Sequence, residues 1–377
     1  MILNQEQQMI RDSVRAFATE RLAPYAPQWD RDCSFPREQL KEMAGMGLLG
    51  ITVPEQWGGA GLDYVSMALA LEEIAAGDGA TSTIISVQSL VCNIFNGYAS
   101  DGQKERFLKP LARGDMLGCF CLTEPHTGSD ASAISTRAER VGAEYVLNGV
   151  KQFITSGKHA DVAVVFAVSD KAAGKKGISA FIVPTGNPGY VVARIEEKLG
   201  QHASDTAQIL LENCRVPAAN LLGPEGMGYR IALANLEGGR ICIAAQSVGM
   251  ARAAFEAALK YAHERVTFGK PIIEHQAVNF RLADMATQIE VGRQMVLHAA
   301  TLRDAALPCL KEASMAKLFA SEMAEKVCSD AIQIHGGYGY VTDFPVERIY
   351  RDVRVSQIYE GASDIQRMVI GRSLAGV

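Results

Sequence analysis

The last third of the chain carries three long stretches in which apolar residues recur every three or four positions. These stretches run from Tyr229 to Arg265, from His275 to Ala306 and from Leu310 to Ile334, and each has a face rich in alanine. Apolar side chains at positions i, i+3, i+4 and i+7 line one face of an α-helix, and small side chains there let neighbouring helices approach closely. We therefore predict that residues 225–377 form a four-helix bundle, with three long helices and a shorter fourth.

The first part of the chain, residues 1–115, shows the same helical periodicity in shorter stretches. Ile10, Val14 and Phe17 recur at helical spacing, and the segment from Val65 to Ala76 repeats the pattern. Several prolines between these stretches end one helix before the next begins. We predict an N-terminal α-helical domain.

The middle of the chain, residues 116–224, consists instead of short runs rich in β-branched and aromatic residues, such as Val162 to Val168. Asn148-Gly149 is predicted to be the turn of a β-hairpin, because both residues tolerate positive φ. Lys171 to Gly177 is predicted to be an exposed hairpin loop. We expect a small β-barrel-like domain here, so that the fold class of the whole chain is α+β and mainly α.

The composition is that of an ordinary globular protein. Of the 377 residues, 48% are hydrophobic and 21% are charged, which is too apolar for a disordered chain. The net charge of −5 comes from well-mixed charges without a basic block, which disfavours nucleic-acid binding. The eight cysteines are scattered without a C-x-x-C pair, so we expect a reducing compartment and no structural zinc or other metal site.

The chain carries no recognisable export or membrane signal. Its first ten residues lack a basic stretch followed by an apolar one, and they look like the start of a helix. The longest apolar runs fall far short of the roughly 20 residues that span a bilayer. We expect a cytoplasmic protein of a bacterium, or the mature form of a protein of the mitochondrial matrix.

Glu360 lies in the segment from Ile358 to Arg367, where a carboxylate comes directly before a tight glycine-containing turn and a helix. One interpretation is that Glu360 stabilises the positive end of the helix dipole beside the N-cap. The other is that it is a functional carboxylate positioned by the turn. The segment alone is compatible with both interpretations.

Two segments of the middle domain combine hydroxyl groups, exposed amides and an aromatic side chain. Phe120 to Asp130 runs from a strand into a loop suited to holding a polar heterocycle, although a plain turn uses the same residue types. Lys151 to Gly157 brings Phe153 close to Thr155, although an aromatic residue in a strand more often belongs to the core.

Two helix ends offer groups that bind phosphate. Gln333 to Tyr340 closes a helix with a glycine cluster whose amides form either an anion-binding nest or a plain C-cap. Arg265, followed by Thr267 and Phe268, gives another helix end either a diphosphate contact or a solvated terminus. No G-x-G-x-x-G motif opens a βαβ unit, which disfavours a Rossmann-type dinucleotide site.

Taken together, these segments resemble the acyl-CoA dehydrogenase family along nearly the whole chain. The motifs follow in the family's order: T-E-P-x-x-G-S-D, F-I-T-S-G, E-G-G-R, E-R-x-x-F-G-K-P-I, Q-I-H-G-G-Y-G-Y and I-Y-E-G-x-S-x-I-Q. The resemblance implies FAD as the cofactor and a homotetramer built as a dimer of dimers. It also implies an electron-transfer flavoprotein as the partner that reoxidises the reduced flavin.

The resemblance also assigns site residues by motif. It implies that the flavin ring is lined by Phe120, Leu122, Thr123, Gly128, Ser129, Phe153, Ile154 and Thr155. It implies that the diphosphate and adenosine end is held, partly from a neighbouring subunit, by Arg265, Phe268, Gln276, Gln333, Gly336 and Gly337. Ala362 and Asp364, where many relatives have Thr and Gln, are expected at the cofactor as well. The expected substrate-binding residues are Ser129, Tyr229, Glu237, Arg240, Tyr359 and Gly361.

The same resemblance implies α,β-dehydrogenation of an acyl-CoA to the trans-2-enoyl-CoA, with Glu360 abstracting the α-proton and hydride passing to FAD. Some relatives carry the base on the long helix, at the position of Gly239, which has no side chain here. Arg240 is expected near the acyl-CoA, or else paired with Glu237 one helical turn away. The run from Glu237 to Gln246 looks most like the short-chain and short/branched-chain members.

Two alternative functions are compatible with the same segments. An acyl-CoA oxidase shares the fold, but the typical oxidases are much longer than this chain. A non-catalytic acyl-CoA or flavin-binding protein generally lacks the base, whereas Glu360 stands here in an intact I-Y-E-G motif. We therefore expect a dehydrogenase.

Overall fold

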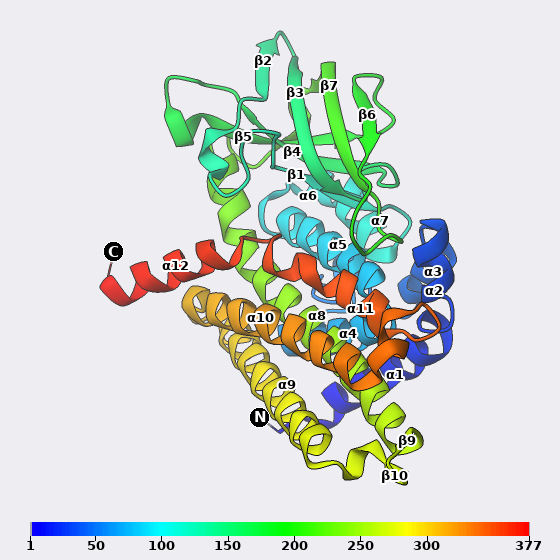
Figure 1. The fold of residues 1–377 in the computed structure, drawn as a ribbon. Coiled ribbons are helices and arrows are strands. Elements are labelled where there is room, and N and C mark those ends of the chain that lie inside the picture. Colours follow the sequence, from blue (N-terminus) through cyan, green and yellow to red (C-terminus); the bar gives the residue numbers. More distant parts are fainter. Residues whose placement is uncertain (1, 377) are drawn as a thin grey trace.

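The computed structural model describes residues 2–376, and its first segment is helical, as predicted (Figure 1). The side chain of Asn4 caps α1 by accepting a hydrogen bond from the backbone of Gln7, and Asp63 and Asp78 cap α4 and α5 in the same way. The elements are α1 (Gln5–Phe17), a π-helical turn (Ala18–Leu22), α2 (Ala26–Asp32), α3 (Arg37–Gly45), α4 (Tyr64–Gly77), α5 (Gly79–Tyr98), α6 (Asp101–Gln103), a second π-helical turn (Lys104–Leu108) and α7 (Lys109–Arg113).

The middle segment forms an eight-stranded sheet within the described residues. The strands run in the order β6-β7-β3-β2-β4-β5-β8, and β1 pairs with β4 in parallel. The loop between β4 and β5 is an exposed hairpin loop, which confirms that prediction. The strands are β1 (Gly118–Cys121), β2 (Arg137–Val141), β3 (Glu144–Thr155), β4 (Val162–Val168), β5 (Ile178–Pro184), β6 (Tyr190–Ile195), β7 (Thr206–Pro217) and β8 (Leu221–Leu222).

The predicted hairpin turn at Asn148-Gly149 is wrong. Both residues lie inside β3, at a bulge where its register with β7 shifts. The chain passes so close to Thr136 that a Cβ atom on Gly149 would lie 2.4 Å from the Thr136 hydroxyl oxygen. The turn between β2 and β3 contains Gly142 instead, with φ of +62°. Asn-Gly therefore serves a bulge here, and the two residue types alone do not distinguish a bulge from a turn.

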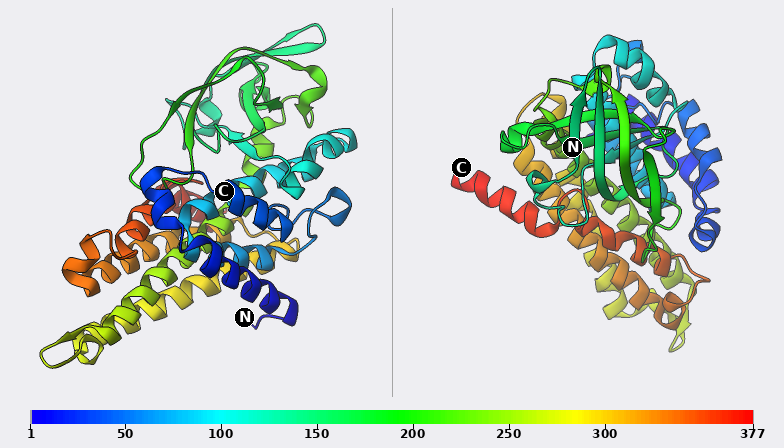
Figure 2. Two further views of the ribbon diagram at one scale, coloured as in Figure 1. Left: turned by 90° about the vertical axis from the view of Figure 1, so that its right-hand side faces the viewer. Right: turned by 90° about the horizontal axis from the view of Figure 1, so that it is seen from above.

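The last segment contains three long helices that pack along one another, as predicted. The shorter α12 contacts α10 and then extends away from the rest of the molecule (Figures 1 and 2). None of the helices within residues 2–376 combines the length and the apolar character needed to cross a membrane. The elements are α8 (Gly228–Glu264), β9 (Val266–Thr267), β10 (Lys270–Pro271), α9 (Gln276–Asp304), α10 (Leu310–His335), α11 (Val346–Val353) and α12 (Ser363–Ala375). The order of helical, β and helical segments confirms the predicted fold class.

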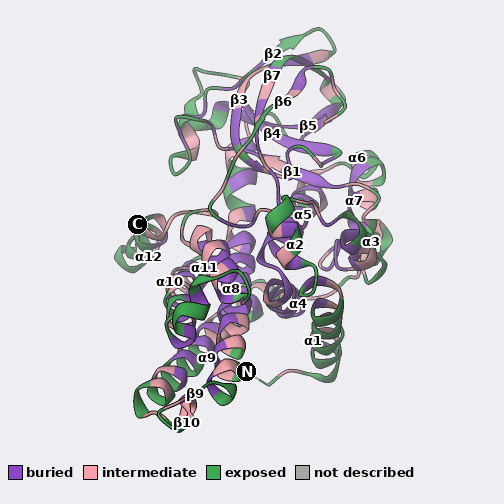
Figure 3. Cartoon of the chain, turned by 45° about the vertical axis from the view of Figure 1, so that its right-hand side comes forward, coloured by how far each residue is buried: buried purple, intermediate pink, exposed green. Residues whose placement is uncertain are grey.

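The N-terminal helices α4 and α5 share a core with α8, and both are buried along most of their length (Figure 3). Gly249 lets α8 touch α4, because a Cβ atom at this position would lie 2.1 Å from the backbone oxygen of Glu72. Glu72 and Glu73 on α4 are buried, and they form ion pairs with Arg252 of α8 and Arg293 of α9. The first and last segments of the chain therefore bury one common interior.

Gly249→Ala is expected to lower the free energy of unfolding by about 1–3 kcal/mol, because the added methyl group forces α4 and α8 apart. Gly97→Ala is the matched control: Gly97 is exposed on α5, and a Cβ atom there meets nothing within 4 Å. It is expected to leave the stability unchanged or raise it by up to about 1 kcal/mol. Chemical denaturation measures both, and equal effects would contradict the close approach of the two helices.

Candidate active site

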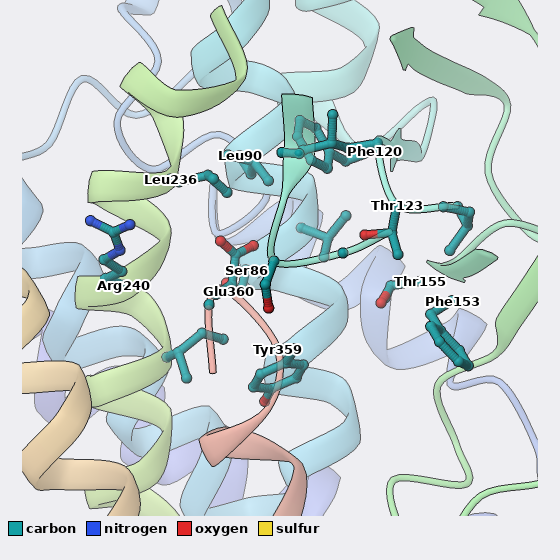
Figure 4. A pocket seen from close by; sticks show the side chains of 18 of the residues that line it. Ser86, Leu90, Phe120, Thr123, Phe153, Thr155, Leu236, Arg240, Tyr359 and Glu360 are labelled. Atoms are coloured by element: carbon teal, nitrogen blue, oxygen red, sulfur yellow. The ribbon is translucent and has the colours of Figure 1, made fainter. Parts of the chain in front are cut away.

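A pocket of about 210 Å³ lies where the three segments of the chain meet (Figure 4). Its walls come from α5, α8, β1 with the loop after it, and the end of β3, and the turn before α12 completes it. The pocket brings together many of the residues predicted for the flavin ring and the substrate: Phe120, Leu122, Thr123, Gly128, Ser129, Phe153, Ile154, Thr155, Arg240, Tyr359, Glu360 and Gly361.

Glu360 lies on the turn between α11 and α12 and points into this pocket (Figure 4). Glu360 and Gly361 have φ of +52° and +92°, and this left-handed backbone is costly for a residue with a side chain. A Cβ atom on Gly239 of α8 would lie 2.8 Å from Oε2 of Glu360, so the missing side chain makes room for the carboxylate. Oε2 is buried and has no hydrogen-bond partner among the described residues. A carboxylate in this state is free to accept a proton.

Two buried cations lie near this carboxylate. Arg240 on α8 is 7% exposed, and Lys317 on α10 is fully buried. Burial raises the pKa of Glu360 to about 7, and the positive charges of Arg240 and Lys317 act in the opposite direction. The alternative that Arg240 pairs with Glu237 is wrong, because Glu237 forms its ion pair with Arg303 at 3.1 Å. Arg240 instead lines the pocket, where its positive charge acts on Glu360.

The wall across the pocket from Glu360 comes from the β domain (Figure 4). Phe153, at the end of β3, has φ of +58° and is 63% exposed. The interpretation of Phe153 as an ordinary core residue is therefore wrong. Thr123 and Thr155 line the same wall. An exposed aromatic ring beside hydroxyl groups suits a planar ring system with polar edges.

A buried ion pair supports this wall. Lys151 of β3 donates hydrogen bonds to Oε1 of Glu124 at 2.8 Å and to the carbonyl oxygen of Leu122 at 3.1 Å. Glu124 also accepts hydrogen bonds from the backbone N–H groups of Ser135 and Thr136. Burial opposes the ionisation of Glu124, but the charge of Lys151 and these hydrogen bonds outweigh it and lower the pKa of Glu124 to about 2. The pair therefore ties the loop after β1 to β3.

A second hollow lies at the far end of α8, beside the hairpin of β9 and β10. It is lined by Arg265, Gly336 and Gly337 among others, and by the rings of Tyr261 and His335, which stack with centroids 4.4 Å apart. The remaining residues predicted for the diphosphate and adenosine end are exposed. Phe268 lies in the turn of the hairpin, Gln333 precedes Ile334 of the hollow, and Gln276 is the first residue of α9. Figures 1 and 2 place the hairpin and the β-sheet at opposite ends of the molecule.

Some of the predicted site residues line neither hollow. Ala362 is the N-cap residue of α12, and the side chain of Asp364 in its first turn is 95% exposed. Tyr229 lies in the first turn of α8, away from the pocket lining, and Glu237 is occupied by its ion pair. The turn before α12 thus directs Glu360 into the pocket, whereas Asp364 points to solvent.

Part of the pocket lining was not assigned to individual residues from the sequence. Most of these residues lie on two helices, and Ala131 and Ile365 complete the set: Thr83, Ser86, Val87 and Leu90 on α5, and Leu233, Leu236 and Ile243 on α8. The α8 residues are spaced three or four positions apart together with Arg240, which places all four on one helix face. On α5, hydroxyl residues at helical spacing in an otherwise apolar helix were the available signal.

Three family models match this chain, one after another. They are the acyl-CoA dehydrogenase N-terminal domain over residues 4–115, the middle domain over 119–214 and the C-terminal domain over 226–375. The chain belongs to the acyl-CoA dehydrogenase family. The expectation drawn from the sequence motifs is therefore confirmed.

Relatives in this family match along essentially the full chain. An acyl-CoA dehydrogenase of Bacillus subtilis (strain 168) is 49% identical, and the match covers 100% of both chains. The mitochondrial short-chain specific acyl-CoA dehydrogenase of Homo sapiens is 47% identical, over 99% of this chain and 90% of the human one. The solved butyryl-CoA dehydrogenase of Megasphaera elsdenii is 41% identical, with a TM-score of 0.97 over 100% of this chain and 99% of that one. This protein is thus an oxidoreductase of the acyl-CoA dehydrogenase type.

FAD is the cofactor of acyl-CoA dehydrogenases. A solved glutaryl-CoA dehydrogenase of Mycobacterium smegmatis, 34% identical with a TM-score of 0.95 over 100% of this chain and 96% of that one, is in complex with FADH2. The residues of this chain fit the cofactor. The exposed ring of Phe153 and the hydroxyls of Thr123 and Thr155 suit the flavin ring, and Arg265 with the amides near Gly336 suits the diphosphate.

Lys151→Met is expected to lower the free energy of unfolding by about 3–5 kcal/mol, because it leaves the carboxylate of Glu124 buried without its counter-charge. FAD is expected to dissociate more readily as well, because the loop after β1 loses its tie to β3. The control is Lys158→Met, at an exposed lysine of the neighbouring turn, with an expected change within about 0.5 kcal/mol. Denaturation curves and flavin absorbance after gel filtration measure both effects, and a stable, flavin-retaining Lys151→Met protein would contradict the assignment.

Proposed function

We propose that this enzyme converts short or short-branched acyl-CoA thioesters to trans-2-enoyl-CoA, with Glu360 as the base. The observation that carries the proposal is the state of Glu360: its Oε2 is buried, has no hydrogen-bond partner among the described residues and faces the pocket. Among the described residues, no other carboxylate lines this pocket.

The α-hydrogen of a thioester is weakly acidic, so the base that removes it must be ionised and poorly solvated. Burial raises the pKa of Glu360 to about 7, which makes it a stronger base than an exposed glutamate. Arg240 and Lys317 oppose this effect and so keep the carboxylate ionised near neutral pH. In the proposed step Oε2 takes the α-proton while the backbone N–H of Glu360 donates a hydrogen bond to the thioester carbonyl.

The β domain and α8 shape the other side of the reaction. Phe153, Thr123 and Thr155 would hold the flavin ring at the wall across from Glu360. When bound, FAD accepts the hydride equivalent from Cβ and passes the electrons to an electron-transfer flavoprotein. Leu90 and Leu236 line the pocket near Glu360 (Figure 4) and exclude water from the reacting carbons.

We propose that each cofactor is held by two chains of a homotetramer. The flavin wall and the diphosphate hollow lie at different ends of one chain: from Arg240 to Arg265, which caps its C-terminus, α8 extends for about 37 Å at 1.5 Å per residue. We infer that one FAD molecule does not bridge the two within a chain. A neighbouring subunit that presents its own Arg265 and glycine cluster completes the site.

The preference for short acyl chains is supported by a buried polar network that joins two residues of the pocket lining. Gln246, fully buried on α8, accepts a hydrogen bond from the hydroxyl of Tyr359 at 2.9 Å and donates one to the carbonyl oxygen of Gly79 at 3.0 Å. It also donates a hydrogen bond to the hydroxyl of Thr83. Thr83 and Tyr359 both line the pocket, so this network fixes two of its walls. A long acyl chain would have to displace satisfied buried polar groups, which is costly.

The test is an anaerobic titration of the purified flavoprotein with straight and branched acyl-CoAs of two to sixteen carbons. Bleaching of the flavin band near ~450 nm is expected for short substrates only. Glu360→Gln is expected to bind the same substrates without bleaching. Bleaching by long chains alone would refute the size preference, and bleaching by the Glu360→Gln variant would refute the base. Reoxidation by oxygen as fast as by the flavoprotein partner would indicate an oxidase.

The rate is expected to depend on pH through Glu360. Because only the ionised carboxylate accepts a proton and its pKa is raised to about 7, kcat/KM is expected to fall about tenfold per pH unit below about pH 7 and to level off above it. A pH series with the best substrate measures this. A fall in kcat/KM that begins only near pH 4.5, the ordinary pKa of a glutamate, would contradict the assignment of a buried carboxylate as the base.

Gln246→Ala is expected to open space behind Thr83 and Tyr359 and shift the ratio of kcat/KM values towards longer acyl chains, by about 10-fold or more for each added carbon that fits. Ser247→Ala is the matched control: Ser247 is equally buried, but its hydroxyl donates within α8 to the carbonyl oxygen of Ile243 and takes no part in the network with Thr83 and Tyr359. Kinetics with a homologous series of acyl-CoAs measure the ratio. Identical chain-length profiles for the two variants would contradict the role of the network.

A further inference from the structure

Lys317 is a buried cation without a matching carboxylate contact. It lies on α10 and is fully buried, and no acidic side chain of residues 2–376 comes within ion-pair distance of its Nζ. Nζ instead donates a hydrogen bond to the carbonyl oxygen of Gly361 at 2.7 Å. A buried ammonium group without an ion pair is costly to the fold, so its presence beside a pocket points to a role in the reaction.

The turn that Lys317 contacts is the one that carries Glu360. Both Glu360 and Gly361 have left-handed backbone conformations, so the turn must be held by its surroundings. Gln366, fully buried on α12, donates hydrogen bonds to the carbonyl oxygens of Glu360 at 3.1 Å and of Gly361 at 2.9 Å. The carbonyl of Gly361 thus accepts two hydrogen bonds, one from a charged donor and one from a neutral donor.

We propose that Lys317 is a positioning residue for the dehydrogenation: its ammonium group fastens the turn of Glu360 through the carbonyl of Gly361 and places a positive charge beside the base. Gln366 also fastens the turn of Glu360, but as a neutral side chain it places no charge beside the base. The proposal rests on the proposed function of Glu360 as the base.

The charge of Lys317 shifts the pKa of Glu360 in a predictable direction. Burial raises the pKa of Glu360, and Arg240 and Lys317 lower it, so removal of either charge is expected to raise that pKa further. Burial lowers the pKa of Lys317 to about 8, which leaves it protonated at neutral pH. The other titratable or charged groups around the turn are Cys242 on α8, the ion pairs of Glu237 with Arg303 and of Glu322 with Arg367, Tyr359 beside the base, and the exposed Asp364.

The experiment compares Lys317→Met with Gln366→Met in the FAD-loaded enzyme. Each variant removes one donor from the same carbonyl oxygen, but only the first removes a charge. Both are expected to lower kcat, by about tenfold or more, because the base is less well placed. Only Lys317→Met is expected to move the acid limb of kcat/KM, upward by about one pH unit. Lys317→Arg, which keeps the charge, is expected to leave the limb where it lies in the parent enzyme.

A second measurement does not depend on turnover. Infrared difference spectra, with Glu360→Gln as the subtraction, follow the carboxyl stretch of Glu360 through a pH titration. The midpoint is expected to rise in Lys317→Met and in Lys317→Gln, which keeps a donor but not the charge. An unmoved midpoint in these variants, or an equal shift in Gln366→Met, overturns the proposal. So does failure of every Lys317 variant to fold and retain FAD, because the role would then be structural.

The same experiment separates this proposal from the one on which it rests. If Glu360→Gln keeps full turnover, the base has been misassigned and both proposals fail. If Glu360→Gln is inactive and the Lys317 variants show no shift, only the role of Lys317 fails.

Discussion

The packing of α8 against α4 on one side and against α9 and α10 on the other is the constraint on which the rest of the structure depends. Gly249 permits the contact with α4, and the buried ion pairs of Glu72 and Glu73 join the same helices. Because α8 also carries Gly239 and Arg240, its position decides where the turn of Glu360 can lie. A change far from the pocket that shifts this helix therefore alters the site without touching it.

Much of the fold could be predicted from periodicity, since long amphipathic helices and short buried strands leave clear patterns in a sequence. The three long helices after residue 225 and the β-rich middle segment were found in this way. The hairpin at Asn148-Gly149 was not, because its glycine serves a bulge and a close approach of Thr136, and such tertiary contacts leave no local pattern. Which helices of the first and last segments share one core could not be predicted either, since this depends on which helix faces meet.

The site residues that belong to family motifs could be predicted from the sequence. Those that act through packing between helices could not. Glu360, Arg240 and the residues around Phe153 came from motifs, and the structure places them around one pocket. The hydroxyl residues of α5, the network of Gln246 and the two donors that hold the turn were missed. These side chains act through contacts between helices distant in sequence, and each of them alone is an ordinary buried polar residue. The exposure of Phe153 was hidden for a related reason, because residue type indicates a core aromatic and only the backbone conformation turns it outward.

Gly239 and Glu360 compete for one volume, and this has a consequence for how such enzymes diverge. A Cβ atom on Gly239 would lie 2.8 Å from Oε2 and 3.1 Å from Cδ of Glu360, so a side chain from α8 can enter this space only if the carboxylate of Glu360 moves out of it. A protein with carboxylates at both positions would hold two negative charges in one buried space, and each charge would disfavour ionisation of the other group. Transfer of the proposed base between the two positions would therefore be an epistatic exchange, in which the effect of each substitution depends on whether the other has occurred.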